Sequence, residues 1–176
     1  MNIYEALKKD HVEVKELLTR LIALNNDDED TRHELVEQIR DALIPHARAE
    51  EMVLYNTLRS LDSTHGVVAH AYKEHLEAET LLRTLQMKDK IDSDWKETAV
   101  KLKEVLEHHI DEEEHKIFAV AKSVLSESEV EMMGKAFEKL KPGIKEESIV
   151  GTTMDLVVNM MPPRFTSTFR KNNLNF

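Results

Sequence analysis

Glycine and proline are scarce in this chain, and their scarcity limits what the chain can fold into. Each occurs only four times among 176 residues, far below the roughly 7% and 5% of average proteins. A β-sandwich or β-barrel needs many tight turns, and tight turns depend on these residues. Apolar residues make up 41% and charged residues 33% of the chain, which is enough to bury a core and unlike a disordered segment. The composition excludes a β-rich fold, and the length predicts one domain.

Hydrophobic residues recur at helical spacing through most of the sequence. We predict four long helices, at about residues 2–25, 31–61, 64–88 and 93–123. Pro45 lies in the middle of the second helix, where it should kink the helix without ending it. Ser126 and Glu129 form a capping box that opens a shorter fifth helix to about residue 139, and the Pro-Gly pair at 142–143 should stop it.

Four long helices joined by short polar loops predict an all-α, up-down-up-down four-helix bundle. We divide the chain into a bundle over 1–123, an additional helix over 124–147 and a partly ordered C-terminal tail over 148–176. The tail contains an interrupted apolar segment at 149–161, followed by two prolines. This segment could cover one end of the bundle, form a homodimer contact or bind a membrane surface, but it is too short to span a membrane.

Several classes of protein are excluded by composition and charge. The chain has no cysteine, which rules out disulfides, iron–sulfur clusters, cysteine zinc sites and thiol catalysis. The formal net charge of −10 disfavours nucleic acid as a partner. The chain has no apolar run of about 18 residues, so the sequence predicts no transmembrane helix. Its charged, amphipathic first residues are unlike a secretory signal. We therefore expect a cytoplasmic protein.

Nine histidines are the unusual feature of the composition. An α-helix turns by about 100° per residue, so each histidine can be placed relative to the apolar face of its own helix. Four of them fall on that face, one in each long helix: His11, His46, His75 and His109. We expect the other five to be solvated, namely His33, His65, His70, His108 and His115.

Three of the inward-facing histidines are followed four residues later by a glutamate on the same face: Glu50, Glu79 and Glu113. Carboxylates are rarely buried unless they are paired or bound to a metal. A single inward histidine would more simply be a core residue, but one in every helix, with three carboxylates beside them, predicts a metal site. Six or seven N and O ligands suit two ions better than one structural zinc, and imidazole with carboxylate suits iron.

Four short motifs carry a resemblance to a known family. They are Asp10-His11, His46 with Glu50-Glu51, Glu74-His75, and His109 with Glu113-Glu114. With these motifs the chain resembles the hemerythrin-like, or HHE cation-binding, family over about residues 1–123. The resemblance implies a non-heme centre of two Fe ions with oxo or hydroxo and carboxylate bridges. On that pattern Glu50 and Glu113 are the bridging carboxylates and the histidines cap the ions.

The chain departs from the pattern of oxygen-carrying hemerythrin at two places. That protein has His-x-x-x-His on the third helix and His-x-x-x-x-Asp on the fourth. Here the partner of His75 is Glu79, and the inward carboxylate of the fourth helix is Glu113, while Glu114 should turn away. The added negative charge favours ferric iron over reversible O2 carriage. The chain is more similar to bacterial HHE subgroups linked to iron handling, oxygen or nitric oxide response and peroxide decomposition.

Three functions could use this set of ligands. The centre could bind, react with or sense O2 or a related small oxidant such as peroxide or NO. It could instead be an enzyme with catalase- or peroxidase-like activity, or it could store or scavenge iron. Glu79 could be a ligand or a proton donor, and Tyr4 and Tyr72 could donate a proton or a hydrogen bond, although core packing explains both tyrosines more simply. An open coordination position and the groups around it decide between these functions.

Overall fold

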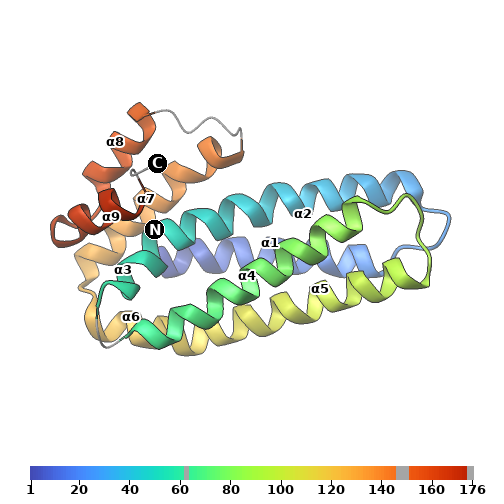
Figure 1. Ribbon diagram of the computed structural model, residues 1–176, viewed down its shortest axis with the longest axis horizontal. Coiled ribbons are helices and arrows are strands. Elements are labelled where there is room, and N and C mark those ends of the chain that lie inside the picture. Colours follow the sequence, from blue (N-terminus) through green and yellow to red (C-terminus); the bar gives the residue numbers. More distant parts are fainter. Residues whose placement is uncertain (62–63, 146–150, 174–176) are drawn as a thin grey trace.

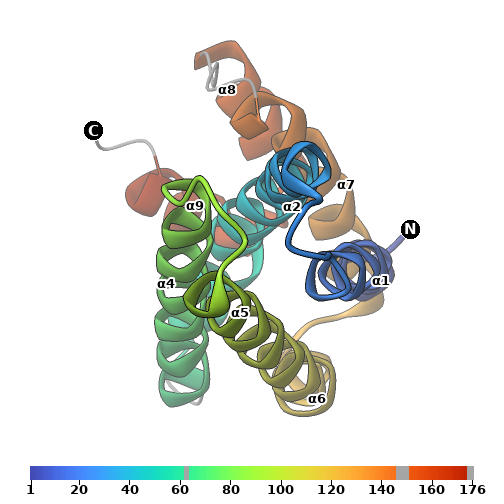
Figure 2. The same ribbon diagram turned by 90° about the vertical axis from the view of Figure 1, so that its right-hand side faces the viewer.

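The computed structural model describes residues 1–61, 64–145 and 151–173, and every regular element in these ranges is a helix. The four long helices are α1 (Ile3–Ile22), α2 (Glu29–Glu50), α4 (His65–Gln86) and α5 (Ser93–Glu112). Helix α1 packs against α2 and α5, and α4 packs against the same two helices, so the four surround a common core (Figures 1 and 2). Successive helices run in opposite directions (Figure 1). The predicted all-α bundle is confirmed.

Two of the long helices continue through a short π-helical turn. The turn η1 (Glu51–Tyr55) and helix α3 (Asn56–Arg59) extend α2, and the turn η3 (Glu113–Ile117) and helix α6 (Phe118–Val124) extend α5. Pro45 lies inside α2 and does not end it. The sequence did not predict the π-turns, whose i→i+5 bonds are rare and often occur at functional sites.

Two hydrophobic clusters fill the bundle, and a polar layer lies between them. One cluster contains Leu7 and Ala71, and the other contains Val14 and Ala78. His11 therefore stands between the two clusters on α1, and His75 stands between them on α4. Leu43 and Ala49 bracket His46 on α2 in the same way. The inward histidines thus share one level of the bundle.

The C-terminal part of the chain packs on one end of the bundle (Figure 1). Helix α7 (Glu127–Lys145) lies against α1 and α2, and α8 (Gly151–Met160) packs on α7, followed by η4 (Pro163–Phe165) and α9 (Thr166–Asn173). Buried side chains of these elements join the first hydrophobic cluster, among them Phe137, Met154, Val157, Phe165 and Phe169. The described part of the apolar segment at 149–161 therefore covers the bundle end. Residues 148–150 and 174–176 of the predicted tail lie outside the described residues.

In the part of the chain that the structure describes, no helix is both long enough and apolar enough to cross a membrane.

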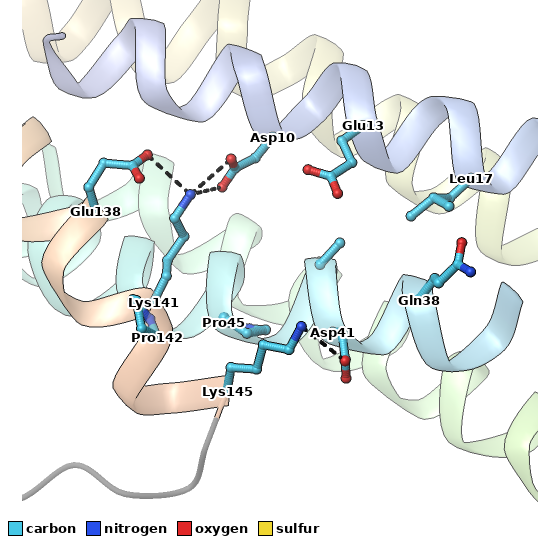
Figure 3. A pocket seen from close by; sticks show the side chains of 11 residues that line it. Asp10, Glu13, Leu17, Gln38, Asp41, Pro45, Glu138, Lys141, Pro142 and Lys145 are labelled. Atoms are coloured by element: carbon cyan, nitrogen blue, oxygen red, sulfur yellow. Dashed lines mark hydrogen bonds and ion pairs between the residues drawn. The ribbon is translucent and has the colours of Figure 1, made fainter. Parts of the chain in front are cut away.

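Helix α7 runs to Lys145, so the prediction that it stops at the Pro-Gly pair 142–143 is wrong. Contacts with the bundle hold its last turn. The Nζ atom of Lys141 lies 2.9 Å from both carboxylate oxygens of Asp10, and Nζ of Lys145 lies 3.1 Å from Oδ2 of Asp41 (Figure 3). A proline inside a helix removes one backbone hydrogen bond. Leu140 is buried in the first hydrophobic cluster and Ile144 packs against it, so tertiary packing continues the helix past the local stop signal.

Gly134 marks a very close contact between α7 and the beginning of α1. A Cβ atom at Gly134 would lie 2.5 Å from the carbonyl oxygen of Met1 and 2.9 Å from the backbone nitrogen of Ile3. Gly134→Ala must push backbone atoms apart, so we expect it to lower the free energy of unfolding by about 1–3 kcal/mol. Urea unfolding of metal-free protein measures this change.

Gly66 provides the matched control, because a Cβ atom there would have nothing within 4 Å. Gly66→Ala should leave the free energy of unfolding unchanged or raise it by up to about 1 kcal/mol, since alanine is the better helix former. Equal effects of the two substitutions would contradict the close packing of α7 on the first residues of α1.

Candidate metal centre

Four histidines, one from each long helix, meet in the polar layer between the two hydrophobic clusters. His11, His46, His75 and His109 are all buried. The Nε2 atoms of His75 and His109 lie 3.0 Å apart, and the ring centroids of His11 and His46 lie 5.1 Å apart. The structure thus brings together the four histidines that the helical wheels placed on inward faces. Four of the other five are exposed, namely His33, His70, His108 and His115; the side chain of His65 lies outside the description.

Two fully buried glutamates lie among these histidines. Oε2 of Glu50 lies 3.4 Å from Nε2 of His75 and 3.7 Å from Nε2 of His46. Oε2 of Glu113 lies 3.1 Å from Nε2 of His11. Within the described residues, none of the four carboxylate oxygens makes a hydrogen bond, and neither does Nε2 of His11. Burying carboxylates in this way is costly unless a cation compensates them, so the donor set fits a metal site.

A carboxylate holds each of the four histidines at Nδ1, on the side away from the centre. The pairs, with N···O distances of 2.8–3.1 Å, are His11 with Glu114, His46 with Asp10, His75 with Glu51, and His109 with Glu74. A carboxylate at Nδ1 favours the tautomer that carries its proton there, which leaves the Nε2 lone pair free for a metal. All four imidazoles therefore turn Nε2 toward the centre.

These four outer acids had no expected role beyond their place in the motifs, and the expectation that Glu114 turns away is wrong. The wheel assumed about 100° per residue, whereas the turn η3 (Glu113–Ile117) is π-helical and winds more slowly. As a result both Glu113 and Glu114 reach the histidines. The turn η1 lies at the corresponding place after Glu50, and there Glu51 reaches His75.

A signal for these acids was present in the sequence. An acid directly precedes His11 and His75, and a pair of glutamates ends the motif that begins at His46 or His109. The two halves also have nearly equal spacing, because 46 − 11 is 35 and 109 − 75 is 34. The same pattern of acids and histidines therefore occurs twice, once on α1 and α2 and once on α4 and α5.

Burial sets the protonation of the metal-free site. It lowers the pKa of His46 to about 4 and also lowers the pKa of His75, so both rings are neutral near pH 7 and able to bind a metal. Burial, aided by the charge of Glu113, raises the pKa of Glu50 well above its usual value. Burial opposes charge on Glu113 too, but the protonated carboxyl of Glu50 and the ring of His11, which face it as hydrogen-bond donors, lower the pKa of Glu113 to about 2. Burial thus favours the protonated form of Glu50 in the metal-free protein.

Glu79 lies at the edge of the site. Its Oε2 atom lies 2.5 Å from Nη2 of Arg48, and its Oε1 atom lies 2.8 Å from Nη2 of Arg83. Both carboxylate oxygens thus face guanidinium groups, and the contacts of Glu79 do not support the expected role as ligand or proton donor. Glu79 and Arg48 instead line a crevice of about 10 Å³ that reaches His75, together with four apolar residues: Leu43, Ile44, Ala47 and Ala78.

The two tyrosines named from the sequence lie in ordinary packing positions. The ring of Tyr4 packs on Phe118 with centroids 4.9 Å apart. The hydroxyl of Tyr72 donates a hydrogen bond to Oδ1 of Asn56 at 2.9 Å. Burial raises the pKa of both tyrosines to about 12. These contacts agree with the simpler explanation of core packing, and the buried hydroxyl of Tyr4 has no hydrogen-bond partner among the described residues.

The tyrosine beside the centre is Tyr55, which the sequence analysis did not name. Its ring stacks on His75 with centroids 5.5 Å apart and an interplanar angle of 22°. Its hydroxyl is buried beside the carboxyl group of Glu50. Burial and the charges of Glu113 and Glu50 raise the pKa of Tyr55 well above its usual value. On an α-helical wheel Tyr55 points about 140° away from Glu50, so only the π-turn η1 explains its position.

Helix α7 also supports the centre. Lys141 pairs with Asp10, and Oδ2 of Asp10 lies 3.1 Å from Nδ1 of His46. Lys141 and Asp10 line an open groove of about 570 Å³ between α1, α2 and α7 (Figure 3). A residue far along the chain thus fixes the carboxylate that orients one of the histidines.

The fold and the donor set define a metal-binding helical-bundle protein. The sequence profile of the hemerythrin HHE cation binding domain matches residues 2–121. The chain belongs to this family, and it is therefore a protein that binds metal cations.

Two further proteins are similar to this chain. A protein of Nostoc sp. (strain PCC 7120) described as a DNA nickase is 30% identical over 146 residues, which cover 83% of this chain and 41% of that protein. The chain thus spans less than half the length of this relative. A crystal structure of a hemerythrin HHE cation binding domain-containing protein from Mycobacterium kansasii has the same fold, with a TM-score of 0.71 and 24% identity. The match covers 92% of this chain and 99% of that chain.

Replacing an outer acid should weaken metal binding without unfolding the protein. Glu114→Gln keeps the size of the side chain but removes the charge that holds Nδ1 of His11, so we expect metal affinity to fall by about 10–100-fold. Competition with a chelator measures this affinity. Asp111→Asn is the control, since Asp111 lies on the same helix with its side chain 74% exposed. Similar losses in both variants would contradict the orienting role of Glu114.

Glu50 should make the metal-free protein less stable as the pH rises. Its pKa is raised in the folded state, so above its unfolded value the folded protein retains a proton that the unfolded chain releases. Stability then falls by up to about 1.4 kcal/mol per pH unit until the folded pKa is reached. Glu50→Gln cannot ionise and lacks this loss.

Urea unfolding of the two metal-free proteins between about pH 5 and 8 measures the difference. The stability of Glu50→Gln relative to the unsubstituted protein should increase with pH. A difference that stays constant with pH would show that burial does not shift the titration of Glu50.

Proposed function

We propose that the chain is a non-heme di-iron protein that reacts with or senses O2 or related small oxidants, such as peroxide and NO. The observation that carries the proposal is the arrangement of the donors in two halves. His75, His109 and Glu50 form one half, with their ligand atoms all within 4.8 Å of one another. The other half contains His11 and Glu113, which lie 3.1 Å apart at Nε2 and Oε2. His46 lies beside His11 in this half and is also near Glu50.

The distances within each half support one ion in each. Two ligand atoms bonded at about 2.1 Å to the same ion lie roughly 3.0 Å apart when the bonds are at right angles. The two Nε2 atoms of His75 and His109 lie 3.0 Å apart, and Nε2 of His11 lies 3.1 Å from Oε2 of Glu113. The carboxylates at Nδ1 favour the tautomers in which both Nε2 atoms carry a lone pair, and a cation between the two lone pairs removes their repulsion. In this proposal Glu50 and Glu113 bridge the two halves.

The chemistry of the donors favours iron over zinc. Structural zinc is usually held by four ligands in a closed tetrahedral site, whereas six N and O donors shared by two ions leave room for a further ligand. Imidazole and carboxylate together are typical ligands of iron. Bound iron would supply the redox chemistry, and the chain contributes four imidazole nitrogens, two buried carboxyl groups and an apolar surrounding.

The route to the centre supports a very small reaction partner. The crevice that reaches His75 has a volume of about 10 Å³, which is close to the space needed by one water molecule. Four of its lining residues are aliphatic, and the Arg48–Glu79 ion pair belongs to the same lining. A diatomic molecule or peroxide fits such a route better than an organic substrate does.

One feature favours peroxide decomposition as the second candidate function. Peroxide turnover requires a proton donor near the reacting atoms. The hydroxyl of Tyr55 is buried beside Glu50, and its ring stacks on His75. Its raised pKa keeps the proton in place at neutral pH. Tyr55 can therefore donate a hydrogen bond to a group bound there, and it passes on its proton only to a strong base such as the oxygen released from peroxide.

Larger partners are not part of the proposal. The nickase activity named for the Nostoc relative belongs to a protein more than twice as long, and a net charge of −10 repels a phosphate backbone. The apolar residues Met154 and Val157 of α8 are buried within this chain, so they do not call for a homodimer. A cysteine-free chain suits a reducing compartment, and we propose a cytoplasmic location.

The reaction of iron-loaded protein with oxidants tests the function. Protein reduced without air should contain close to two irons per chain and should oxidise rapidly when mixed with O2 or peroxide in a stopped-flow spectrometer. If the reduced iron is oxidised by neither O2 nor peroxide, the proposed reaction with oxidants is contradicted and iron storage is the function that remains. Binding of a single zinc ion in place of iron would contradict the di-iron centre itself.

Tyr55→Phe separates the second candidate function from the first. It removes the proton donor but no ligand, so iron content should stay the same while peroxide turnover falls by about 10²–10⁴-fold. Tyr72→Phe is the control, because that hydroxyl is bonded to Asn56. Unchanged turnover in Tyr55→Phe would exclude Tyr55 as the proton donor.

A further inference from the structure

A second group of histidines and glutamates lies on the outer side of α4 and α5. This outer cluster consists of His70 and Glu74 of α4 and His108 and Glu112 of α5, and it offers four ligand atoms within 4.8 Å of one another. Oε1 of Glu74 lies 3.3 Å from Nε2 of His70 and 3.6 Å from Nε2 of His108. The oxygens of Glu112 lie 3.8 Å and 3.9 Å from the same two nitrogens.

Helix geometry explains why these four side chains converge. His70 and Glu74 are four residues apart, as are His108 and Glu112, so each pair lies on one face of its helix. His108 and Glu112 each precede the corresponding inner residue by one position, which rotates them by about 100° from the buried face. The sequence analysis expected both histidines to be solvated, and their side chains are 58% and 62% exposed. They are nevertheless gathered at one point where α4 and α5 pack together.

The donor set matches a four-coordinate divalent cation. Ligand atoms at about 2.0–2.1 Å from a tetrahedral zinc ion lie roughly 3.3 Å apart, and the four nitrogen–oxygen distances of the outer cluster are 3.3, 3.6, 3.8 and 3.9 Å. Two neutral imidazoles and two carboxylates also balance two positive charges. We propose that the outer cluster binds one divalent cation of the zinc type, in addition to the ions of the inner centre.

Glu74 connects this site with the inner centre. Its Oε1 atom faces the outer cluster, while its Oε2 atom lies 3.0 Å from Nδ1 of His109. A cation on Oε1 draws the carboxylate charge away from His109, which makes Nε2 of His109 a weaker donor to the inner centre. The outer cation therefore tunes the inner site through one shared carboxylate.

One neighbouring charge competes with a cation in the outer cluster. The ammonium group of Lys116 pairs with Oε1 of Glu112, which leaves Oε2 of Glu112 facing His70. Because Lys116 is itself 66% exposed, it can move away when a cation binds. Lys116→Gln should therefore tighten cation binding at the outer cluster.

The experiment titrates Co²⁺ into protein whose inner centre is already filled and follows the intense visible absorption of four-coordinate Co²⁺. The unsubstituted protein should take up one further equivalent. The double variant His70→Ala/His108→Ala should lose this uptake. Its affinity for Co²⁺ should fall by more than 100-fold, because loss of a group that only orients the ligands costs about 10–100-fold. His115→Ala is the matched control, since this exposed histidine of the α5 extension pairs with Asp111 and not with the cluster.

A variant of the inner centre keeps this proposal separate from the proposed function. His11→Ala impairs the inner site but leaves all four residues of the outer cluster in place, so it should retain the four-coordinate Co²⁺ absorption even if the inner centre does not hold iron. Uptake that is equal in the double variant and the unsubstituted protein would overturn the outer site. Absence of the further equivalent in the unsubstituted protein would overturn it as well.

Discussion

The burial of Glu50 and Glu113 among four imidazole rings is the constraint on which the rest of the structure depends. Two carboxylates without hydrogen bonds in the middle of a bundle oppose folding unless protons or cations compensate them. Every long helix places one imidazole ring next to these carboxylates. The register of all four helices is therefore fixed at this level. The carboxylates at Nδ1 complete the arrangement, because they turn the four Nε2 lone pairs toward the same space.

The remainder of the fold serves to hold this polar layer in place. Hydrophobic clusters lie on both sides of it, and together they anchor each helix above and below its histidine. The elements after residue 121, beyond the family match, take part as well. Their buried side chains join the cluster at one end, and Lys141 fixes Asp10 behind His46. The C-terminal helices are thus part of the support of the centre.

Helical periodicity was sufficient to predict the bundle and the four histidines that converge in it. It failed where its assumption of uniform winding failed: the π-turns η1 and η3 bring Glu51, Glu114 and Tyr55 to the centre from directions that an α-helical wheel assigns elsewhere. Tertiary contacts decide other positions, as at Glu79, whose two carboxylate oxygens pair with Arg48 and Arg83. A wheel describes one helix in isolation, so it cannot predict which partner a long side chain will meet.

Anomalous diffraction at the iron absorption edge, from crystals of the iron-loaded protein, is the measurement that tests the central claim most directly. Two iron peaks should appear in the polar layer, one at Nε2 of His75 and His109 and the other at Nε2 of His11 and His46. The carboxylates of Glu50 and Glu113 should lie between the two peaks. A single peak, or iron bound at Nδ1 atoms or outside this layer, would contradict the account.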